Sequence, residues 1–503
     1  MRNNLLATIP WIILTGLGVG LEAQSTLPAS TPEVHTSQAE LERRVDELSQ
    51  AIDRAQRRLA ESQTEILALQ TEVGALHVQM ARAGAGAADA PGQTATEERE
   101  QALENAVALH DQIKVESKSK YPLRVTGLIL FNGYVNEGVP DNSDIPEVAG
   151  AMTTTSGEGS VGGSFRQTIL GLEGDGPRVF GAHTSASVAF DFFSGITDRS
   201  YGTSAGIVRM RTASINFDWP HDSLSVGMAA PLISPLSPSS YATVAEPALA
   251  GAGNLWTWAP QLRYRHRMPL PRKNELQLEL GLLDAAAAGY SSSLYFRNAS
   301  PGELSKQPGY ETRVSYLRPG DRGLQLGASG YYSRESYPAY GGYRGKDGLD
   351  SWAGAFDIRL PFARHFEVSG EGYRGRALGG LGGGVYKNVV IGTKPVLGES
   401  VLHGLNAIGG WSQLKTRFSP TLESNLSIGL DDGLARDFHA VTLPPGASAT
   451  QLRARNKMVI GNLIFKPKTY IILSPEYRRI WTWPISGPAN TVDIFTLAVG
   501  YQF

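Results

Sequence analysis

The apolar positions of the chain follow two different periods, and the period changes near residue 121. From Leu41 to Met80 apolar residues recur at alternating steps of four and three, whereas beyond Tyr121 they alternate with polar residues at every second position. A period of 3.5 is typical of a coiled-coil helix, and a period of two is typical of a β-strand with two different faces. The sequence therefore predicts a helical coiled coil followed by an all-β domain.

The helical segment contains more than five consecutive heptads. Its predicted core positions are Leu41, Val45, Leu48, Ile52, Leu59, Ile66, Leu69, Val73 and Leu76. The apolar face is only two positions wide in each heptad. Because so narrow a face needs partner helices, we expect the protein to oligomerise. Ala55 and Ser62 weaken the core, and the heptads leave dimer and trimer both open. An amphipathic helix folded onto its own chain is the alternative interpretation.

Clusters of Pro, Gly or Asp between alternating segments predict seven tight turns, which begin at residues 174, 219, 268, 318, 360, 418 and 465. Long irregular segments separate them, and we expect eight long loops near residues 136–163, 194–206, 231–258, 285–307, 335–349, 376–403, 432–450 and 483–490. Short turns that alternate with long loops predict sixteen antiparallel strands.

Short turns at one rim and long loops at the other are typical of outer-membrane barrels. The faces agree, since Leu278 and Leu280 share a side opposite Gln277 and Glu279. A soluble sandwich would also alternate, but it would not need eight loops on one side. The predicted fold class is an all-β transmembrane barrel of about 16 antiparallel strands over residues 121–503, preceded by a periplasmic α-helical coiled coil.

The first residues predict export. Arg2, the apolar run from Leu5 to Leu21 and small Ala23 have the order of a secretory signal peptide. The predicted organisation is a signal peptide at 1–23, a linker at 24–38, the oligomerising coiled coil at 39–82, a Gly/Ala-rich linker at 83–96, a charged helix and connector at 97–120, and the barrel at 121–503.

Composition excludes several classes of function. The 46 basic and 48 acidic residues give a formal net charge of −2, so we expect no nucleic-acid partner. The chain has no Cys, which excludes disulfides and thiolate sites. The His residues show no metal-ligand spacing, and no nucleophile lies near a base in the sequence. We therefore expect no enzyme activity, no metal and no cofactor.

The segment "QLRYRHRM" contains the most informative inward row. Arg263, Arg265 and Arg267 follow Gln261 on one face of the predicted strand. A barrel of sixteen strands is wide enough for an aqueous channel, and three guanidiniums along its wall would attract anions. The same arginines could instead pair with acidic residues of neighbouring strands and brace the wall. The sequence leaves both interpretations open.

The third long loop, residues 231–258, is rich in Pro, Ser and Gly. In barrels of this size such a loop can fold inward and narrow the pore, and an exposed loop is the alternative. Tyr241 and Glu246 are its candidate specificity residues. Further candidates for the lumen are Arg166, Lys415, Arg417, Glu367 and Glu371.

The chain ends on "TLAVGYQF", a strand that places Tyr501 and Phe503 on the same face as Phe495 and Leu497. This face is predicted to contact lipid. A terminal aromatic residue resembles the signal read by the outer-membrane assembly machinery, so Tyr501 and Phe503 are the predicted assembly signal and that machinery is an expected partner.

Signal peptide, coiled coil and sixteen-stranded barrel, together with "LRVTGLILFNGYV" and "PQLRYRHR", resemble the trimeric coiled-coil porins of the DcaP type and, more distantly, phosphate-selective porins. The resemblance implies a homotrimer with one pore per subunit and a preference for small anions such as dicarboxylates or phosphate. Where those porins carry Gly-Gln before the third loop, this chain has Gly227 and Met228.

The sequence thus predicts a diffusion porin for small hydrophilic solutes, with a mild preference for anions, in the outer membrane of a Gram-negative-type bacterium. The coiled coil is expected in the periplasm, with peptidoglycan as its candidate partner. Outer-membrane lipid and lipopolysaccharide are expected around the barrel. The alternative is a structural envelope protein that tethers the outer membrane to the cell wall through its coiled coil.

Overall fold

The computed structural model describes residues 122–503, except for residues 155, 196–205, 285–297, 319, 321–322, 338–346 and 395–398. The predicted signal peptide, linkers, coiled coil and charged helix lie outside the described residues. Within the described part, no helix is long and apolar enough to cross a membrane.

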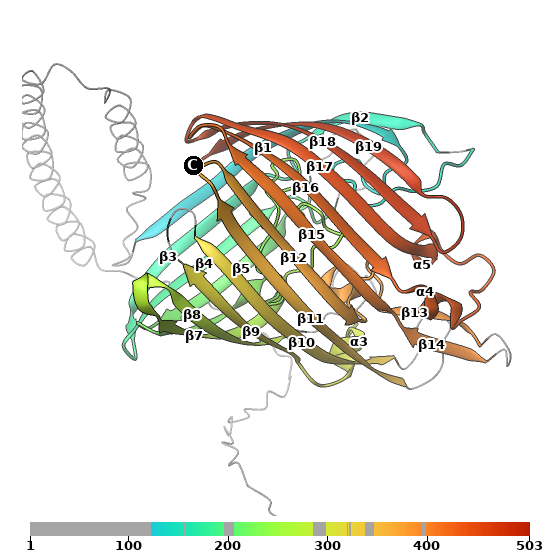
Figure 1. The fold of residues 1–503 in the computed structure, drawn as a ribbon, viewed down its shortest axis with the longest axis horizontal. Coiled ribbons are helices and arrows are strands. Elements are labelled where there is room, and N and C mark those ends of the chain that lie inside the picture. The colour runs from blue at the N-terminus through green and yellow to red at the C-terminus, as the bar shows by residue number, and fades with distance from the viewer. Residues whose placement is uncertain are drawn as a thin grey trace, which may run out of the picture. The chain divides into compact units, whose positions relative to one another are not determined.

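One large antiparallel sheet forms the body of the molecule (Figure 1). Its first strands are β1 (Leu123–Gly138), β2 (Gly159–Ser164), β3 (Ile169–Val179), β4 (Ala182–Asp191), β5 (Arg209–Asp218), β6 (Asp222–Ala229), β7 (Ala259–Pro269), β8 (Glu275–Leu283) and β9 (Gly309–Arg318). Its later strands are β10 (Leu324–Tyr337), β11 (Asp347–Phe362), β12 (Phe366–Arg376), β15 (Asn406–Arg417), β16 (Leu422–Gly433), β17 (Arg453–Lys468), β18 (Ile471–Pro484) and β19 (Asn490–Gln502).

The sheet closes on itself, because β1 pairs with β19 as well as with β2 and β3. β2 and β3 both lie antiparallel to β1 and continue one another across residues 165–168. Counted as one strand, they give the described part of the chain a closed barrel of sixteen strands. The predicted strand number and fold class of the barrel are confirmed.

Short elements lie in the turns and loops. They are the 3-10 helices η1 (Pro271–Lys273) and η2 (Gly379–Leu381), the helices α3 (Pro301–Leu304), α4 (Ala435–His439) and α5 (Ala449–Leu452), and the hairpin of β13 (Val389–Thr393) and β14 (Ser400–Gly404). We call the two ends of the barrel the short-turn rim and the long-loop rim. The long-loop rim carries α4, α5 and the hairpin, at the right of Figure 1.

Two predicted turns lie a few residues from the observed ones. The cluster at 174 forms a bulge inside β3, with a register shift between Asp175 and Arg178, and the chain turns at Phe180 and Gly181. Both turn residues have positive φ, as a two-residue hairpin turn requires. Similarly, the cluster at 465 is a bulge in β17, and the turn follows Lys468. Pro and Gly mark bulges as well as turns.

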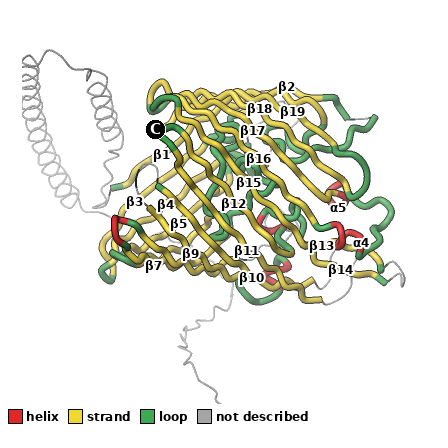
Figure 2. Tube along the Cα trace, in the orientation of Figure 1, coloured by secondary structure: helices red, strands yellow, loops and turns green. Residues whose placement is uncertain are grey.

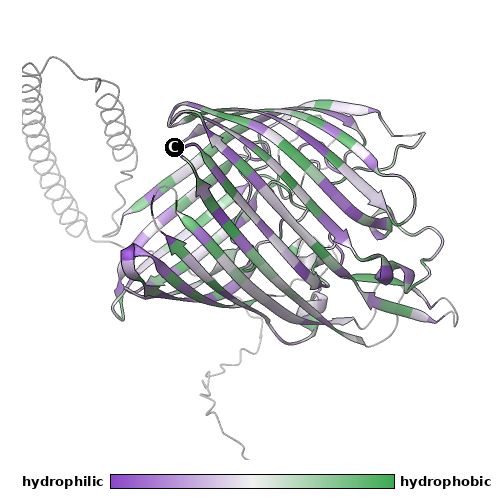
Figure 3. Cartoon of the chain, viewed as in Figure 1, coloured by the Kyte–Doolittle hydropathy of each residue, from purple (hydrophilic) through white to green (hydrophobic). Residues whose placement is uncertain are grey.

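Alternation gives each strand an outward and an inward face. Figure 3 shows hydrophobic and hydrophilic residues alternating along the strands. On β19, Phe495, Leu497 and Val499 point outward, and Phe495 is 49% exposed. Val492 and Ile494 point inward and are buried. The exposed large apolar side chains of the other strands follow the same alternation, so the barrel has an apolar outer surface.

The last residue helps to close the barrel. Gly127 N–H donates to the Phe503 carbonyl (2.9 Å), and Phe503 N–H donates to the Gly127 carbonyl (3.0 Å). The Phe503 ring covers Gly127, where a Cβ would lie only 2.5 Å from Cζ of the ring. An aromatic side chain over a glycine of the neighbouring strand is a known way to stabilise a sheet at that point.

This packing predicts the effect of Gly127→Val. The new side chain displaces the Phe503 ring, and overpacking of this kind costs about 1–3 kcal/mol. We expect the folded band to disappear at a lower temperature in heat-modifiability electrophoresis. Gly461→Val is the matched control, because nothing lies within 4 Å of a Cβ at Gly461 on β17. Equal losses in both variants would contradict the proposed packing.

Candidate pore and its third loop

The third loop, residues 230–258, lies inside the barrel and contacts the inner wall strand after strand. Leu232 N–H donates to the Glu311 carboxylate on β9 (2.9 Å). Further along, Leu236 N–H donates to Glu371 on β12 (2.7 Å). Loop segments are visible within the strand wall in Figure 2. The loop therefore leaves β6 and crosses to the opposite side of the lumen.

The loop then continues around the wall. Ser239 N–H donates to Gln413 on β15 (2.7 Å), and Val244 N–H donates to Gln167, between β2 and β3 (2.6 Å). Arg209 on β5 donates to the carbonyl of Ala245, the next residue of the loop (2.9 Å). Of the two paths that the sequence left open, the inward one is observed, and this loop narrows the passage.

An apolar cluster fixes the loop on β15 and β17–β19. It comprises Ala149 of the first loop, Leu236, Ala248, Leu249 and Ala252 of the third loop, and Trp411, Met458, Ile460, Ile480, Val492 and Ile494 of the wall. The sequence predicts a wet interior at the inward positions. On these strands part of the inward face is instead apolar, because the third loop covers it and removes it from water.

The two candidate residues of the third loop have different surroundings. The Tyr241 ring lies under the Lys466 ammonium of β17, with Nζ 5.2 Å from the ring centroid. Glu246 lies against the Glu147 carboxyl of the first loop, which also accepts a hydrogen bond from the Tyr386 hydroxyl. Tyr241 is thus placed beside a cation of the wall, and Glu246 belongs to a buried contact between loops.

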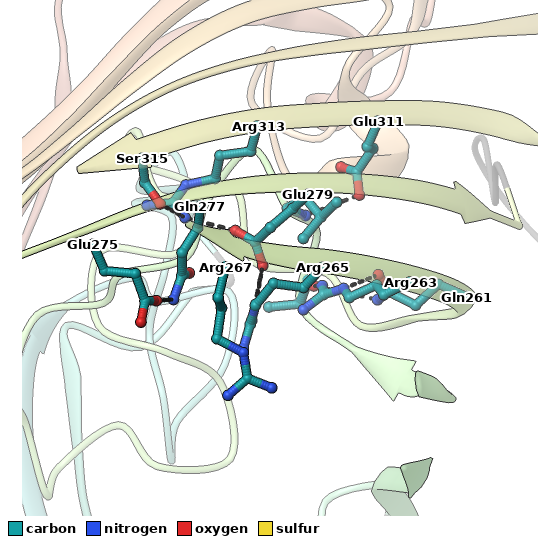
Figure 4. Close-up of polar contacts among 12 residues, drawn as sticks. Gln261, Arg263, Arg265, Arg267, Glu275, Gln277, Glu279, Glu311, Arg313 and Ser315 are labelled. Atoms are coloured by element: carbon teal, nitrogen blue, oxygen red, sulfur yellow. Dashed lines mark hydrogen bonds and ion pairs between the residues drawn. The ribbon is translucent and has the colours of Figure 1, made fainter. Parts of the chain in front are cut away.

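The predicted row of arginines lies on the inward face of β7 (Figure 4). Arg263 is half-buried, and its Nε donates to Gln261 (2.7 Å) while its Nη2 donates to the Ala230 carbonyl. This arginine therefore fastens the start of the third loop to the wall.

Arg265 shares a carboxylate with an arginine that the sequence analysis missed. Glu279 on β8 accepts from Arg265 Nε (2.9 Å) and from Arg313 Nη1 (2.7 Å). Arg313 on β9 also makes a two-pronged contact with Asp357 (3.0 and 2.9 Å). Arg313 is buried, whereas the Arg265 side chain is 41% exposed. Arg313 therefore braces three strands, and Arg265 faces the lumen.

Arg267 is 29% exposed, and its nearest carboxylate oxygen, on Asp218, lies 3.5 Å away. A cavity of about 160 Å³ opens beside this row. Its lining residues are Asn216, Asp218, Ser223, Leu224, Ser225, Arg263, Arg265 and Glu279. The cavity thus combines guanidinium, hydroxyl and amide donors, which suit a small oxyanion, with the carboxylates of Asp218 and Glu279, which oppose one.

Arg209 and Arg211 on β5 extend the row toward the long-loop rim. Both donate to carbonyls of the third loop, and the Arg211 guanidinium lies 4.5 Å from the Trp258 ring centroid. A register shift opposite Ala189 and Phe190 lets both arginines face inward. The sequence signal was "RMR" in an alternating segment, the same pattern that identified β7.

The other lumen candidates have partners. Arg166 pairs with Asp144 of the first loop (2.9 Å). Arg417 pairs with Glu367 (2.9 Å), and Lys415 pairs with Glu423 on β16 (3.3 Å). Glu371 is buried and accepts from Ser234, Leu236 N–H and Trp411 Nε1, so it anchors the third loop. Among the described residues, no group of three His, Cys, Asp or Glu could hold a metal ion.

A contact between the buried Glu147 and the half-buried Glu246 joins the first loop to the third. Trp256 Nε1 donates to the Tyr386 hydroxyl (3.2 Å), which donates to Glu147, so the sixth loop joins the same contact. Burial and, next, the charge of Glu246 raise the pKa of Glu147 well above 4.5, with Asp141 adding to the effect. Burial also raises the pKa of Glu246. The contact therefore favours a proton between the two carboxyl groups.

Comparisons with known proteins bear on the fold. No family model matches the chain, and no curated protein matches it by sequence. The structure is similar to that of the outer membrane channel DcaP of Acinetobacter baumannii, with 16% identity, a TM-score of 0.58 and coverage of 78% of this chain and 100% of that chain. The chain has the DcaP fold. An anion-selective porin from Comamonas acidovorans matches at 12% identity and a TM-score of 0.46, with 76% and 100% covered, which is too distant to inform function.

The anchoring of the third loop in this DcaP-fold barrel predicts the effect of Glu371→Ala. The change removes the acceptor of buried donors, which costs about 1–3 kcal/mol for a group left unpaired. We expect a looser loop, and hence a larger and noisier single-channel conductance in planar bilayers. Glu367→Ala is the control, because Glu367 lies on the same face of β12 and pairs with Arg417. A conductance change of the same size in the control would show that charge, and not anchoring, matters.

A second prediction concerns pH. The pKa of the Glu147 carboxyl is raised while the first loop is packed in place. Above pH 4.5 this carboxyl therefore keeps its proton in the packed loop and loses it when the loop opens. The contact is therefore most stable at low pH and weakens as the pH rises through the raised value. We expect amide hydrogen exchange in residues 139–150, corrected for the intrinsic rate, to be faster at pH 9 than at pH 5. Glu147→Gln should remove most of this difference, and an unchanged pH dependence in that variant would refute the assignment.

Proposed function

We propose that the protein is an outer-membrane diffusion porin for small hydrophilic solutes with a mild preference for anions. The observation that carries the proposal is the partly exposed pair Arg265 and Arg267 on the lumen wall, of which Arg265 lines the cavity of about 160 Å³. Arg313 is buried in the wall, and Arg263, which is half-buried, holds the start of the third loop. The anion-contacting part of the row is thus Arg265 and Arg267.

The use of carboxylates in the wall supports the anion preference. Glu311 and Glu371 accept hydrogen bonds from the third loop, and Asp357 forms an ion pair with Arg313. These inward acids are buried, so they present little negative charge to a passing solute. Asp218 beside Arg267 remains 47% exposed, so the exposed basic residues give the lumen beside the loop only a mild preference for anions.

The outer surface supports a membrane location. A closed barrel leaves no unpaired strand edge, and its outward residues are apolar, as lipid requires. The DcaP fold agrees with this location. We further propose a homotrimer held by the coiled coil of residues 39–82 in the periplasm, and a role of Tyr501 and Phe503 in assembly. The resemblance of the sequence to DcaP-type porins supports the homotrimer, and the aromatic residues at the end of the last strand support the role in assembly.

The test is the reversal potential of purified protein in planar bilayers under a potassium chloride gradient. For Arg265→Gln plus Arg267→Gln we expect the chloride preference of the wild type to disappear, because two lumen charges are lost while Arg313 still pairs with Glu279. Lys394→Gln plus Arg436→Gln removes the same charge from exposed positions in the long loops and should leave selectivity unchanged.

Two outcomes would contradict the proposal. Wild-type selectivity in the double variant would mean that Arg265 and Arg267 only brace the wall. Trimers that form no channels would favour the structural envelope protein instead.

A further inference from the structure

A belt of charged and aromatic side chains lies on the outer surface of β16–β19, above the apolar part of these strands. Tyr477 on β18 pairs with Phe495 on β19, and both are exposed outward. One outward position closer to the long-loop rim, Arg479 pairs with Asp493. The outward face therefore changes from apolar to charged within a single step along two neighbouring strands.

The belt continues on β17. Lys457 lies opposite Trp481 and Arg455 lies opposite Trp483 in the register of β17 and β18. Their inward neighbour Met458 is buried in the loop-covered cluster, so Lys457 and Arg455 point away from the lumen. Three cations and two tryptophans thus share one outward patch, which we call the rim patch: Arg455, Lys457, Arg479, Trp481 and Trp483.

The three cations of the rim patch outnumber the two carboxylates that pair with them, and a third carboxylate, Glu137 of β1, lies opposite Asp493. Arg455 pairs with Asp432 (2.8 Å), and Arg479 lies 3.5 Å from Asp493. Lys457 has no carboxylate partner among the described residues, and its Nζ lies 5.3 Å from the Trp481 ring centroid. The two guanidinium side chains are 47% and 40% exposed. The patch can therefore accept an anionic group from outside the barrel.

An apolar groove of about 1000 Å³ lies on the outer surface next to the rim patch, on its side toward the short-turn rim. Its lining includes Leu426, Leu463, Tyr477 and Phe495, and Gly461 leaves room between them. Tyr477 and Phe495 are also the residues next to Arg479 and Asp493 along their strands. The cationic patch and the apolar groove are thus continuous, with the polarity of an amphiphile.

We propose that the rim patch and the groove bind a phosphorylated lipid of the surrounding leaflet. Arg455, Lys457 and Arg479 contact the phosphate, for which guanidinium and ammonium groups are suited. An acyl chain lies in the groove, and the two tryptophans mark the boundary between hydrocarbon and headgroups. Basic residues at this depth attract anionic lipid headgroups. The proposal rests on the membrane location given above, and it is independent of conduction.

The test is native mass spectrometry of the detergent-purified protein titrated with dioleoylphosphatidic acid or with zwitterionic dioleoylphosphatidylcholine. The wild type should bind phosphatidic acid more tightly. Lys457→Gln plus Arg479→Gln should weaken that binding about tenfold and leave phosphatidylcholine binding unchanged. Heat modifiability and wild-type ion selectivity of this variant show that its barrel is intact and that the channel is a separate property.

The matched control is again Lys394→Gln plus Arg436→Gln, which changes the net charge by the same amount and should bind phosphatidic acid as the wild type does. Equal losses in both double variants would mean unspecific attraction by net charge and would overturn the site. Wild-type binding by Lys457→Gln plus Arg479→Gln would also overturn it. A change in oligomer mass with unchanged lipid binding would identify the patch as a contact between copies of the chain, against the proposal.

Discussion

The pairing of β1 with β19 is the contact on which the rest of the structure depends. A strand edge in a bilayer would leave peptide N–H and C=O groups without a hydrogen-bond partner, at several kcal/mol each. The pairing of Leu128 with Gln502 and the two hydrogen bonds between Gly127 and Phe503 remove that edge. Once the sheet is closed, alternation along every strand divides the side chains between an outer surface and a lumen.

The lumen is organised by its third loop. A loop that crosses the interior brings main-chain N–H groups away from water, and these need acceptors. Inward carboxylates provide them at Glu311 and Glu371, while inward apolar residues of β17–β19 pack under the same loop. Where the loop lies on the wall, the wall therefore presents carboxylates to loop N–H groups, arginines to loop carbonyls and apolar side chains to apolar loop residues. Partly exposed basic side chains remain on β7, the strand that follows the loop.

The fold could be predicted from the sequence because its signals are local. Period-two alternation and seven clusters of turn residues were enough for sixteen strands and for the inward face of β7. The clusters at 174 and 465 were less informative, since a bulge and a turn use the same residue types. The bulge at Arg211 and the role of Arg313 depend on the neighbouring strands. The path of the third loop depends on partners as far away in sequence as 236 residues, the separation of Ser240 and Glu476.

The alternation of side chains along each strand decides whether a basic residue faces the lumen or the outside of the barrel. Arg265 and Lys457 both lie in polar segments of long strands, but Arg265 points into the lumen and Lys457 points away from it. A slip of one residue in the pairing of either strand would exchange these environments, since successive side chains lie on opposite faces. The buried cluster under the third loop resists such a slip on β17, because it would expose Met458 and Ile460 outward and bring charges under the loop. The loop thus narrows the lumen and, through the wall it covers, fixes which charges face the outside.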